Sequence, residues 1–505
     1  MKMKNERLRH QETTEKPYRG IGTHHTTIKN KRNEMEERFR YQLDRRAGDG
    51  TLRSLRHSLS VKDNSAPKTP ARKRPSTSPA IDFASNDYLG LARCPHQLRV
   101  VEKAFASHVP KLVASGSPIL GSTGSRLLSG DTSLAASLEI DLAKAHNRPA
   151  ALLFNSGYDA NLSVLGCSLM PGDIVVMDER CHNSLIMGVR MSRLGWEGGE
   201  SSGNVKMFRH NDVESLVEVL DNIVNPGSNG PTSALGKDSK ILIVVESVYS
   251  MDGDVAPLEQ ILDVASSRGA SVVVDEAHGL GIYGTTNADD LILDGGKSAK
   301  CKSQARNSTG GGTGVLAALN LERHSALLCS VHTFGKAAGC HGAVVAASRT
   351  TVDYLINYAR PFVYSTSPPP HALVTIRCAY EAMMGPVGEE RRQKVFQLVN
   401  LFRLSLDGKA KQMGLQAALG NKSLLLPSPS PIQAVLIPGN HQCIELCSRL
   451  HSSSFDVYPI RSPTVPKGQE RVRIIIHSHN TEEEVGSLVG ALTSEILAMT
   501  MRSKM

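Results

Sequence analysis

The residues best suited to chemistry follow a short apolar run in the middle of the chain. In VVVDEAHG, Asp275 ends the run and His278 comes three residues later. Residues that leave the carboxyl end of a buried parallel strand lie where open α/β sheets bind ligands. Taken alone, an aspartate here is more often the cap of the next turn. A functional interpretation therefore needs a reactive partner elsewhere in the chain.

Lys336 is the candidate partner. It lies 58 residues beyond His278, in SVHTFGKAAG, between Gly335 and Ala337. Small neighbours allow a planar ligand to approach, and a partly desolvated lysine can form a Schiff base with an aldehyde cofactor. The expected partner of such a lysine is a buried aspartate that keeps a pyridinium nitrogen protonated. Asp275 and Lys336 together predict pyridoxal 5′-phosphate.

Two further segments fit this cofactor. In LLFNSGYDAN, an apolar run leads through Gly157 and Tyr158 into a helical pattern, where backbone N–H groups could hold a phosphate. In MDERCHNSL, His182 follows another apolar run and could stack on a pyridine ring. The glycine-rich segment at 121–130 follows no clear strand and lacks the spacing of a dinucleotide fingerprint.

The elements that would position these residues alternate along the chain. The apolar runs AALLFN, DIVVMD, KILIVVES and ASVVVDEA predict buried parallel strands, and LRVVEKAFASHV and SLAASLEIDLAKAH predict amphipathic helices. Such alternation predicts an α/β fold whose mostly parallel sheet has helices on both faces. From about residue 371 the helical pattern resumes, and PIQAVLIP and ERVRIIIHS predict strands of a smaller α+β domain.

Composition bounds the class of protein. The 505 residues are 40% hydrophobic and 21% charged, which suits a globular chain of more than one domain. Residues 1–80 hold 20 Lys+Arg and 9 Asp+Glu, whereas the net charge of the whole chain is +9. The body is therefore not basic, and we expect no nucleic-acid partner. The longest apolar runs fall short of the roughly 18 residues that span a bilayer, so we expect no membrane partner.

Several segments depart from this pattern. The basic extension 1–80 is too poor in apolar residues to fold well, and we expect it to be mostly disordered, with one helix near 34–58. Low-complexity stretches near 285–320 and 421–431 are interpreted as surface insertions. Cys443 and Cys447 share a helical face but lack nearby ligand partners, so no metal site is predicted.

The ordered motifs resemble those of the α-oxoamine synthases, a family of fold-type I pyridoxal-phosphate enzymes. The resemblance covers about residues 81–480. It implies a cofactor-binding major domain at 81–370, a small domain at 371–500 and a homodimer with shared active sites. The motifs that carry it are IDFASNDYLGLA, GSTGSRLLSG, LFNSGYDAN, MDERCHNSL, ESVYSMDGDVAPL, VVVDEAHGLGIYG, HTFGKAAG, YSTSPPP, SPTVPKGQERVRI and HSH.

The resemblance also implies roles for single residues. Lys336 would carry the Schiff base, and Asp275 would bind the pyridine nitrogen. Nearby residues would contact the other parts of the cofactor, some of them across the dimer interface. These are His182 stacked on the ring, His278 and Ser250 at the ring hydroxyl, Gly157, Tyr158 and Thr333 at the phosphate, and Ser365 and Thr366 reaching the partner's cofactor.

Substrate contacts follow from the same resemblance. Arg473 matches the arginine that holds the amino-acid carboxylate, a role that suits a bidentate guanidinium. Thr464 and Asn86 would line the pocket. LDRRAGDGTLRSLR resembles an amino-terminal helix of the family, which would bring Arg53 near the far carboxylate of a dicarboxylic acyl chain; a solvated helical arginine is the equal alternative.

The implied activity is a decarboxylative condensation of L-alanine with an acyl-CoA. TFGKA, YSTS and the IRSPTVP run favour pimeloyl-CoA, and thus biotin biosynthesis by an acyltransferase. Alternatives are another amino acid and acyl-CoA pair, as in glycine C-acetyltransferase, 5-aminolevulinate synthase or a secondary-metabolite enzyme. A further alternative is a non-catalytic partner subunit, against which Lys336 argues.

Two residues depart from the family pattern, and the last three residues bear on the subcellular location. Ala135 stands where the family usually has a histidine, and Ser462 interrupts the usual double proline before Thr464. Both leave the substrate open and the cofactor machinery intact. The terminal tripeptide Ser503–Met505 is a variant of the S-K-L signal, which predicts a peroxisomal protein, with the cytoplasm as the alternative.

Overall fold

The computed structural model describes residues 34–49, 51–52, 80–194, 204–224, 238–284, 311–415 and 423–502. The chain divides into two units, Met1–Arg56 and His57–Met505. In the first unit, α1 spans Glu34–Gly48. The helix expected at 34–58 is thus present and ends at Gly48. Arg53 lies outside the described residues.

A seven-stranded sheet forms the centre of the second unit, in the order β2-β8-β7-β6-β5-β3-β4. The five strands from β4 to β7 are parallel neighbours, and β8 runs antiparallel to both β2 and β7. All four apolar runs expected to be strands are confirmed. The bounds are β2 Ala150–Phe154, β3 Ile174–Asp178, β4 Val205–Phe208, β5 Ile241–Glu246, β6 Ser271–Asp275, β7 Leu327–Thr333 and β8 Ala343–Ala347.

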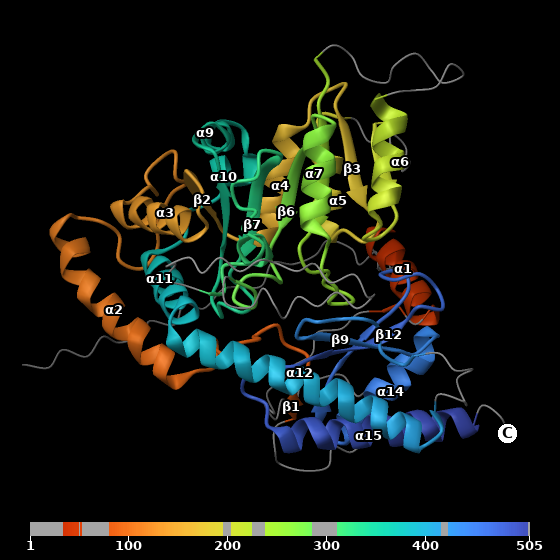
Figure 1. Cartoon of the computed structure of the whole chain (residues 1–505). Coiled ribbons are helices and arrows are strands. Elements are labelled where there is room, and N and C mark those ends of the chain that lie inside the picture. The colour runs from red at the N-terminus through yellow and green to blue at the C-terminus, as the bar shows by residue number, and fades with distance from the viewer. Residues whose placement is uncertain are drawn as a thin grey trace, which may run out of the picture. The chain divides into compact units, whose positions relative to one another are not determined.

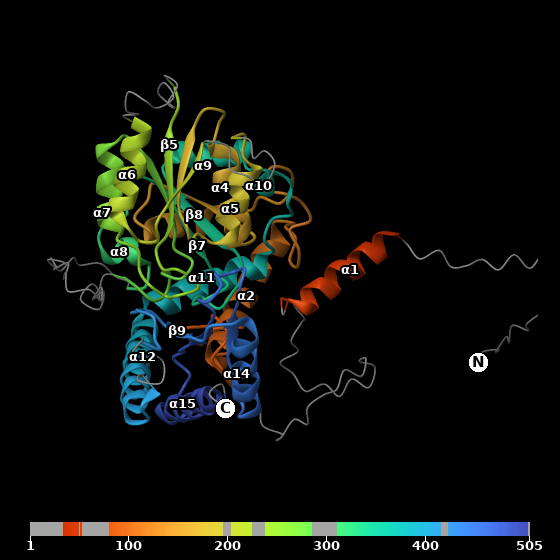
Figure 2. The same cartoon turned by 90° about the vertical axis from the view of Figure 1, so that its right-hand side faces the viewer.

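Both faces of this sheet are covered. Successive side chains of a strand point to opposite sides of the sheet, so one strand contributes to the apolar clusters on both faces. Val272 and Val274 belong to one apolar cluster, and Val273 belongs to the other. Figure 2 shows α6 and α7 on one side of the sheet and α4, α5 and α10 on the other. The helix bounds are α3 Ser133–Ala145, α4 Gly157–Ser168, α5 Asn183–Met191, α6 Val213–Val224, α7 Leu258–Ser267, α9 Arg349–Tyr358 and α10 Arg360–Tyr364.

A smaller antiparallel sheet, β11-β12-β9, packs with three helices around a third apolar cluster. In Figure 1 these elements lie below the large sheet. The two predicted strands are confirmed as β9 and β12. The bounds are β9 Ile432–Leu436, β11 Tyr458–Ile460, β12 Arg471–Ile475, α12 Pro386–Gln412, α14 Asn440–Ser452 and α15 Glu482–Arg502.

Two segments connect the layers. β1 (Ile81–Asp82) pairs with β10 (Phe455–Asp456), so the start of the described body joins the layer formed by the end of the chain. α11 (Pro370–Met384) packs against α2 (Pro95–Ala114), and α11 contributes Leu373 to a cluster of the large sheet. The domain limits predicted at 370 and 371 stay a prediction.

The prediction of a surface insertion is partly wrong for both stretches. Residues 285–310 lie outside the described residues, but 311–318 are buried and include α8, Val315–Ala318. A side chain at Gly314 would lie 2.8 Å from the Glu276 carboxyl group, so glycine here lets the backbone approach Glu276 closely. In the second stretch, Ser428 and Ser430 are buried, and the Ser428 hydroxyl donates to Gly253 O at 3.0 Å.

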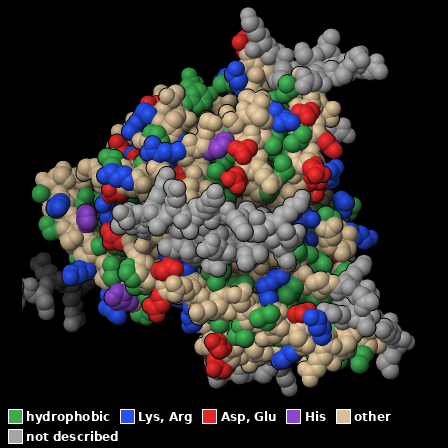
Figure 3. Space-filling model, viewed as in Figure 1, with side chains coloured by type: hydrophobic (Ala, Val, Ile, Leu, Met, Phe, Trp, Pro, Cys, Tyr) green, Lys and Arg blue, Asp and Glu red, His purple; other side chains and the backbone are tan. Residues whose placement is uncertain are grey.

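The surface is not dominated by one sign of charge. Figure 3 shows basic and acidic side chains interspersed over the described part of this face. Among the described helices, none is long and apolar enough to cross a membrane.

Candidate active site

Asp275 lies at the carboxyl end of β6 and is 4% exposed. One carboxylate oxygen accepts from the Ala277 backbone at 2.9 Å, and the other accepts from Asn161 Nδ2 at 2.7 Å. Asn161 Nδ2 also donates to Ser184 Oγ at 2.9 Å. These two donors fix the orientation of the Asp275 carboxyl group at the edge of the sheet.

Lys336 and His278 meet beside this carboxylate. Lys336 Nζ lies 2.7 Å from His278 Nε2, and the Tyr88 hydroxyl lies 2.6 Å from His278 Nδ1. Burial lowers the pKa of Lys336 to about 8, although the nearby Asp275 and Glu246 carboxyl groups oppose the shift. Burial and the charge of Lys336 keep the pKa of His278 well below its usual range. Lys336 is therefore a nucleophilic amine near neutral pH, held by a neutral imidazole.

Arg473 continues the same network from the smaller sheet. Its Nη2 donates to Asn86 Oδ1 at 2.8 Å, and the Tyr88 hydroxyl lies 3.3 Å from the same oxygen. Arg473 Nε is buried and has no hydrogen-bond partner among the described residues. Since a buried donor without a partner is costly, this guanidinium is available for an anionic group of a substrate. The structure thus brings Asn86 and Arg473 together, and their roles toward a substrate stay predictions.

His182 and Ser250 sit on two neighbouring loops. His182 is the N-cap of α5, and its Nδ1 accepts from the Ser184 backbone at 3.2 Å. Partial desolvation lowers the pKa of His182, so its exposed ring is neutral at pH 7. Ser250 is buried. Glu246 Oε1 accepts from the His182 backbone at 2.6 Å, and the Ser250 backbone also hydrogen-bonds to Glu246.

The start of α4 forms a close contact with the end of β7. Ser156 caps the helix by accepting from Asp159 N at 3.1 Å. A side chain at Gly157 would collide with the Thr333 hydroxyl, so glycine is required there. The free N–H groups of this helix start and the Thr333 hydroxyl form a cradle suited to a phosphate. Tyr158, the next residue, is 44% exposed.

Other predicted residues lie further from this centre. Ser365 is partly exposed and Thr366 is exposed. Thr366 O accepts from Asn155 Nδ2 at 2.9 Å, next to the cradle. Thr464 is exposed in a turn, where its backbone N–H donates to Arg461 O at 2.9 Å. Among the described residues, no hydrogen bond joins Thr464 to Lys336 or Arg473.

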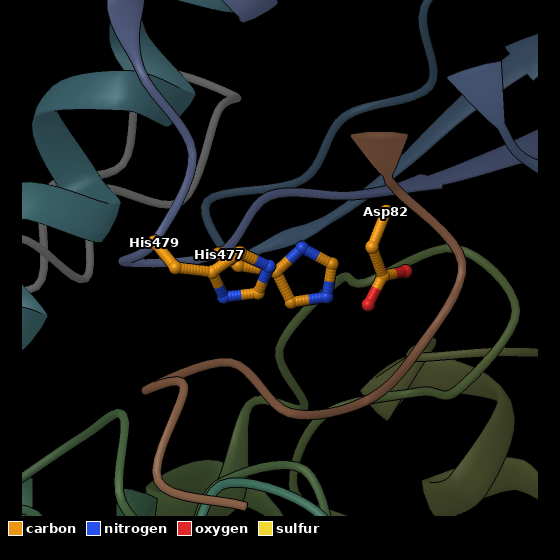
Figure 4. Close-up of side chains that lie close together, drawn as sticks. All are labelled: Asp82, His477 and His479. Atoms are coloured by element: carbon orange, nitrogen blue, oxygen red, sulfur yellow. The ribbon is translucent and has the colours of Figure 1, made fainter. Parts of the chain in front are cut away.

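The fold also gathers potential metal ligands, although no metal site was predicted. Figure 4 shows Asp82 beside His477, on which His479 stacks with ring centroids 4.6 Å apart. His477 Nε2 lies 2.9 Å from Ser85 O, and its Nδ1 lies 3.1 Å from Asn480 Oδ1, so both ring nitrogens already have polar neighbours. Asp82 pairs with Arg93. Because two of the three ligand groups are engaged, we assign no metal to this cluster.

A second cluster is an ion network. His210 Nδ1 lies 2.9 Å from Asp178 Oδ1, and its Nε2 lies 2.6 Å from Asp254 Oδ2. Burial alone would lower the pKa of His210, but the two carboxylates raise it to about 9. The ring is thus an imidazolium that donates twice, and a cation would be repelled.

Sequence reasoning missed several residues of the site. Glu246 begins the quoted motif ESVYSMDGDVAPL and Asn161 ends LFNSGYDAN, but neither residue was singled out within its motif. Tyr88 was only part of a quoted motif, although it lies 190 positions from His278 in sequence and touches it. A signal for Glu246 was available, since its strand neighbours Val244 and Val245 are entirely apolar and a carboxyl group there has to be buried.

Comparisons with known proteins show the family. The model of the class I and II aminotransferase family matches residues 78–492. An 8-amino-7-oxononanoate synthase from Emericella nidulans is 33% identical over 454 residues, which cover 88% of this chain and 96% of that protein. One from Cupriavidus pinatubonensis is 33% identical over 84% of this chain and 88% of that protein.

Solved structures share the fold. Serine palmitoyltransferase from S. paucimobilis is similar with a TM-score of 0.67 at 24% identity, covering 92% of this chain and 99% of that chain. An 8-amino-7-oxononanoate synthase from Francisella tularensis is similar with a TM-score of 0.59 at 22% identity. The match covers 83% of this chain and 98% of that chain. The expected fold-type I architecture is thereby confirmed.

The lowered pKa of Lys336 gives a direct test. We expect its labelling by an amine-reactive reagent to rise with pH around a midpoint near 8, because only the free amine reacts. Quantitative mass spectrometry of the labelled peptide, over pH 6 to 11, measures this midpoint. A midpoint near the ordinary lysine value of about 10.4 would contradict the environment described here.

Proposed function

The chain belongs to the class I and II aminotransferase family, and we propose that it condenses L-alanine with pimeloyl-CoA to give 8-amino-7-oxononanoate, CoA and CO2, a step of biotin biosynthesis. The relatives named 8-amino-7-oxononanoate synthase support this reaction. The observation that carries the proposal is the buried Lys336–His278 pair beside Asp275, facing the unpartnered Arg473 Nε.

The site fits pyridoxal 5′-phosphate. Gly157, Tyr158 and Thr333 would hold the phosphate, and the glycine contact leaves no room for a side chain there. His182 would cover one face of the ring, and Asp275 would keep a proton on the ring nitrogen. When bound, the cofactor supplies an electron sink for negative charge on the α-carbon of the amino acid.

The residues around that cofactor would bind the amino acid and transfer protons. Arg473, fixed through Asn86, would bind the alanine carboxylate. Lys336, with its pKa near 8, would take the α-proton of alanine and later return a proton to the product. His278 would hold the Lys336 amine through Nε2, and Tyr88 would keep the imidazole in place. Burial of the site excludes water from these proton transfers.

Purified protein should release CoA from pimeloyl-CoA with L-alanine and much more slowly with other pairs. A thiol-coupled assay would cross alanine, glycine and serine with pimeloyl-, acetyl-, succinyl- and palmitoyl-CoA. Preference for another pair would reassign the substrates within the α-oxoamine synthases. The similarity in fold to serine palmitoyltransferase is the reason for including serine and palmitoyl-CoA.

Two variants check that the turnover comes from this site. Lys336→Ala should lower kcat by roughly 10²- to 10⁴-fold, because proton transfer is lost. Arg473→Gln should raise the KM for alanine by about tenfold or more, because a charge-assisted hydrogen bond is lost. Unchanged turnover in Lys336→Ala would exclude the assigned site.

We also propose a homodimer. Three large apolar side chains are strongly exposed near one another: Leu127 at 50%, Leu128 at 85% and Tyr364 at 80%. Their segments are joined, since Ser367 Oγ donates to Gly130 O at 2.8 Å. Such a patch is typical of an interface, and it lies beside Ser365 and Thr366, which would then reach the partner's cofactor.

Leu128→Glu should shift the mass in solution from about twice the 54.5 kDa of the chain to the single chain. Burying a charge in an apolar interface is costly. Light scattering across a concentration series would measure the mass. Leu404→Glu is the matched control, because Leu404 is 75% exposed on α12. Equal masses for the two variants would place the interface elsewhere.

For the location we propose the peroxisome, on the basis of Ser503–Met505, which lie outside the described residues. Removing these three residues from an amino-terminally tagged chain should move it to the cytosol, as seen by fluorescence microscopy with a peroxisomal marker. Unchanged peroxisomal fluorescence would indicate another targeting signal within the chain.

A further inference from the structure

Glu246 is a buried carboxyl group that the proposed reaction does not use. It ends β5 and is 2% exposed. β5 and β6 are parallel, and Glu246 stands in register with Asp275. Two carboxyl groups thus lie side by side at the carboxyl edge of the sheet, and only one of them is needed to hold a ring nitrogen.

The hydrogen bonds of Glu246 join the two loops that flank the cofactor site. Its Oε1 accepts from the backbone N–H of His182, at the start of α5, at 2.6 Å. The backbone of Ser250, in the loop that follows β5, also hydrogen-bonds to the carboxyl group. Glu246 therefore sets the position of His182 relative to the sheet through the main chain.

Burial favours the neutral form of Glu246. It raises the pKa of Glu246 to about 8, Asp275 adds to the shift, and Lys336 opposes it. Asp275 faces it from β6, Lys336 from the segment after β7, Arg473 from β12, and Cys181 and Tyr249 from the flanking loops. Two adjacent carboxyl groups in a dry site are costly to ionise together.

We propose that Glu246 is a positioning residue: its carboxyl group anchors the His182 main chain beside Asp275, the carboxyl group assigned to the ring nitrogen. This inference rests on the proposed cofactor. A second anion would compete with Asp275 for the ring-nitrogen proton and would hold Lys336 in its ammonium form. Glu246 thus supplies a hydrogen-bond acceptor for His182.

The test compares three variants by cofactor binding. Glu246→Gln keeps a neutral acceptor and should bind pyridoxal phosphate within about threefold of the unaltered protein. Glu246→Ala leaves the His182 N–H buried without a partner and should bind about tenfold more weakly. Glu276→Gln is the matched control, because Glu276 is equally buried but bonds to Ser247, Val315 and Leu316; its affinity should stay unchanged.

The pH dependence of the bound cofactor's absorbance separates positioning from simple stability. In the unaltered holoenzyme we expect the absorbance to contain a component that follows the ionisation of Glu246, and we expect Glu246→Gln to lack it while Glu276→Gln keeps it. Equal affinity of the alanine variant and the unaltered protein would overturn the proposal. So would a glutamine variant as impaired as the alanine variant, or one whose titration is identical to that of the unaltered protein.

These readouts need no acyl-CoA. A wrong choice of substrates would leave them unchanged, whereas a wrong role for Glu246 would appear in them even if alanine and pimeloyl-CoA are turned over. If Glu246→Ala fails to fold, the titration of Glu246→Gln decides alone, since the amide is of nearly the same size and shape.

Discussion

The desolvation of charged groups at one edge of the large sheet is the constraint on which the site depends. Three parallel strands, β5, β6 and β7, end together there and deliver Glu246, Asp275 and Thr333. In water, a lysine beside these groups would be a protonated, solvated cation. Burial lowers its pKa to about 8 instead. The apolar clusters on both faces of the sheet therefore support the chemistry by keeping this edge dry.

A site of this kind is completed by residues that are distant in the sequence. Asn86 and Arg473, which lie 387 positions apart, are joined by a 2.8 Å hydrogen bond. The pairing of β1 with β10 makes this possible, because it carries the segment that starts at Ile81 into the layer of the smaller sheet. Lys336 and Arg473 thus belong to different layers that face one another.

The sequence allowed the strands, the central residues and the family to be predicted, because buried strands and strand-end residues leave local patterns. Asp275 was singled out as a strand-end residue and Lys336 by its small neighbours, and the structure places them near each other. Tyr88 and Glu246 were not found, because their roles arise only from tertiary packing. Gly314 shows the opposite error: a glycine-rich stretch was interpreted as solvated, whereas its small residues allow the backbone to approach the buried Glu276.

The pairing of β1 with β10 has a consequence for the way the protein is made. The first strand of the body has to wait for a partner some 370 residues later, so its contact is among the most non-local in the chain. Such contacts form slowly, because loop closure precedes any gain from them. During synthesis, the large sheet can assemble while Phe83 and its neighbours are still uncovered. The contact between Asn86 and Arg473 can therefore form only after the smaller sheet has been synthesised.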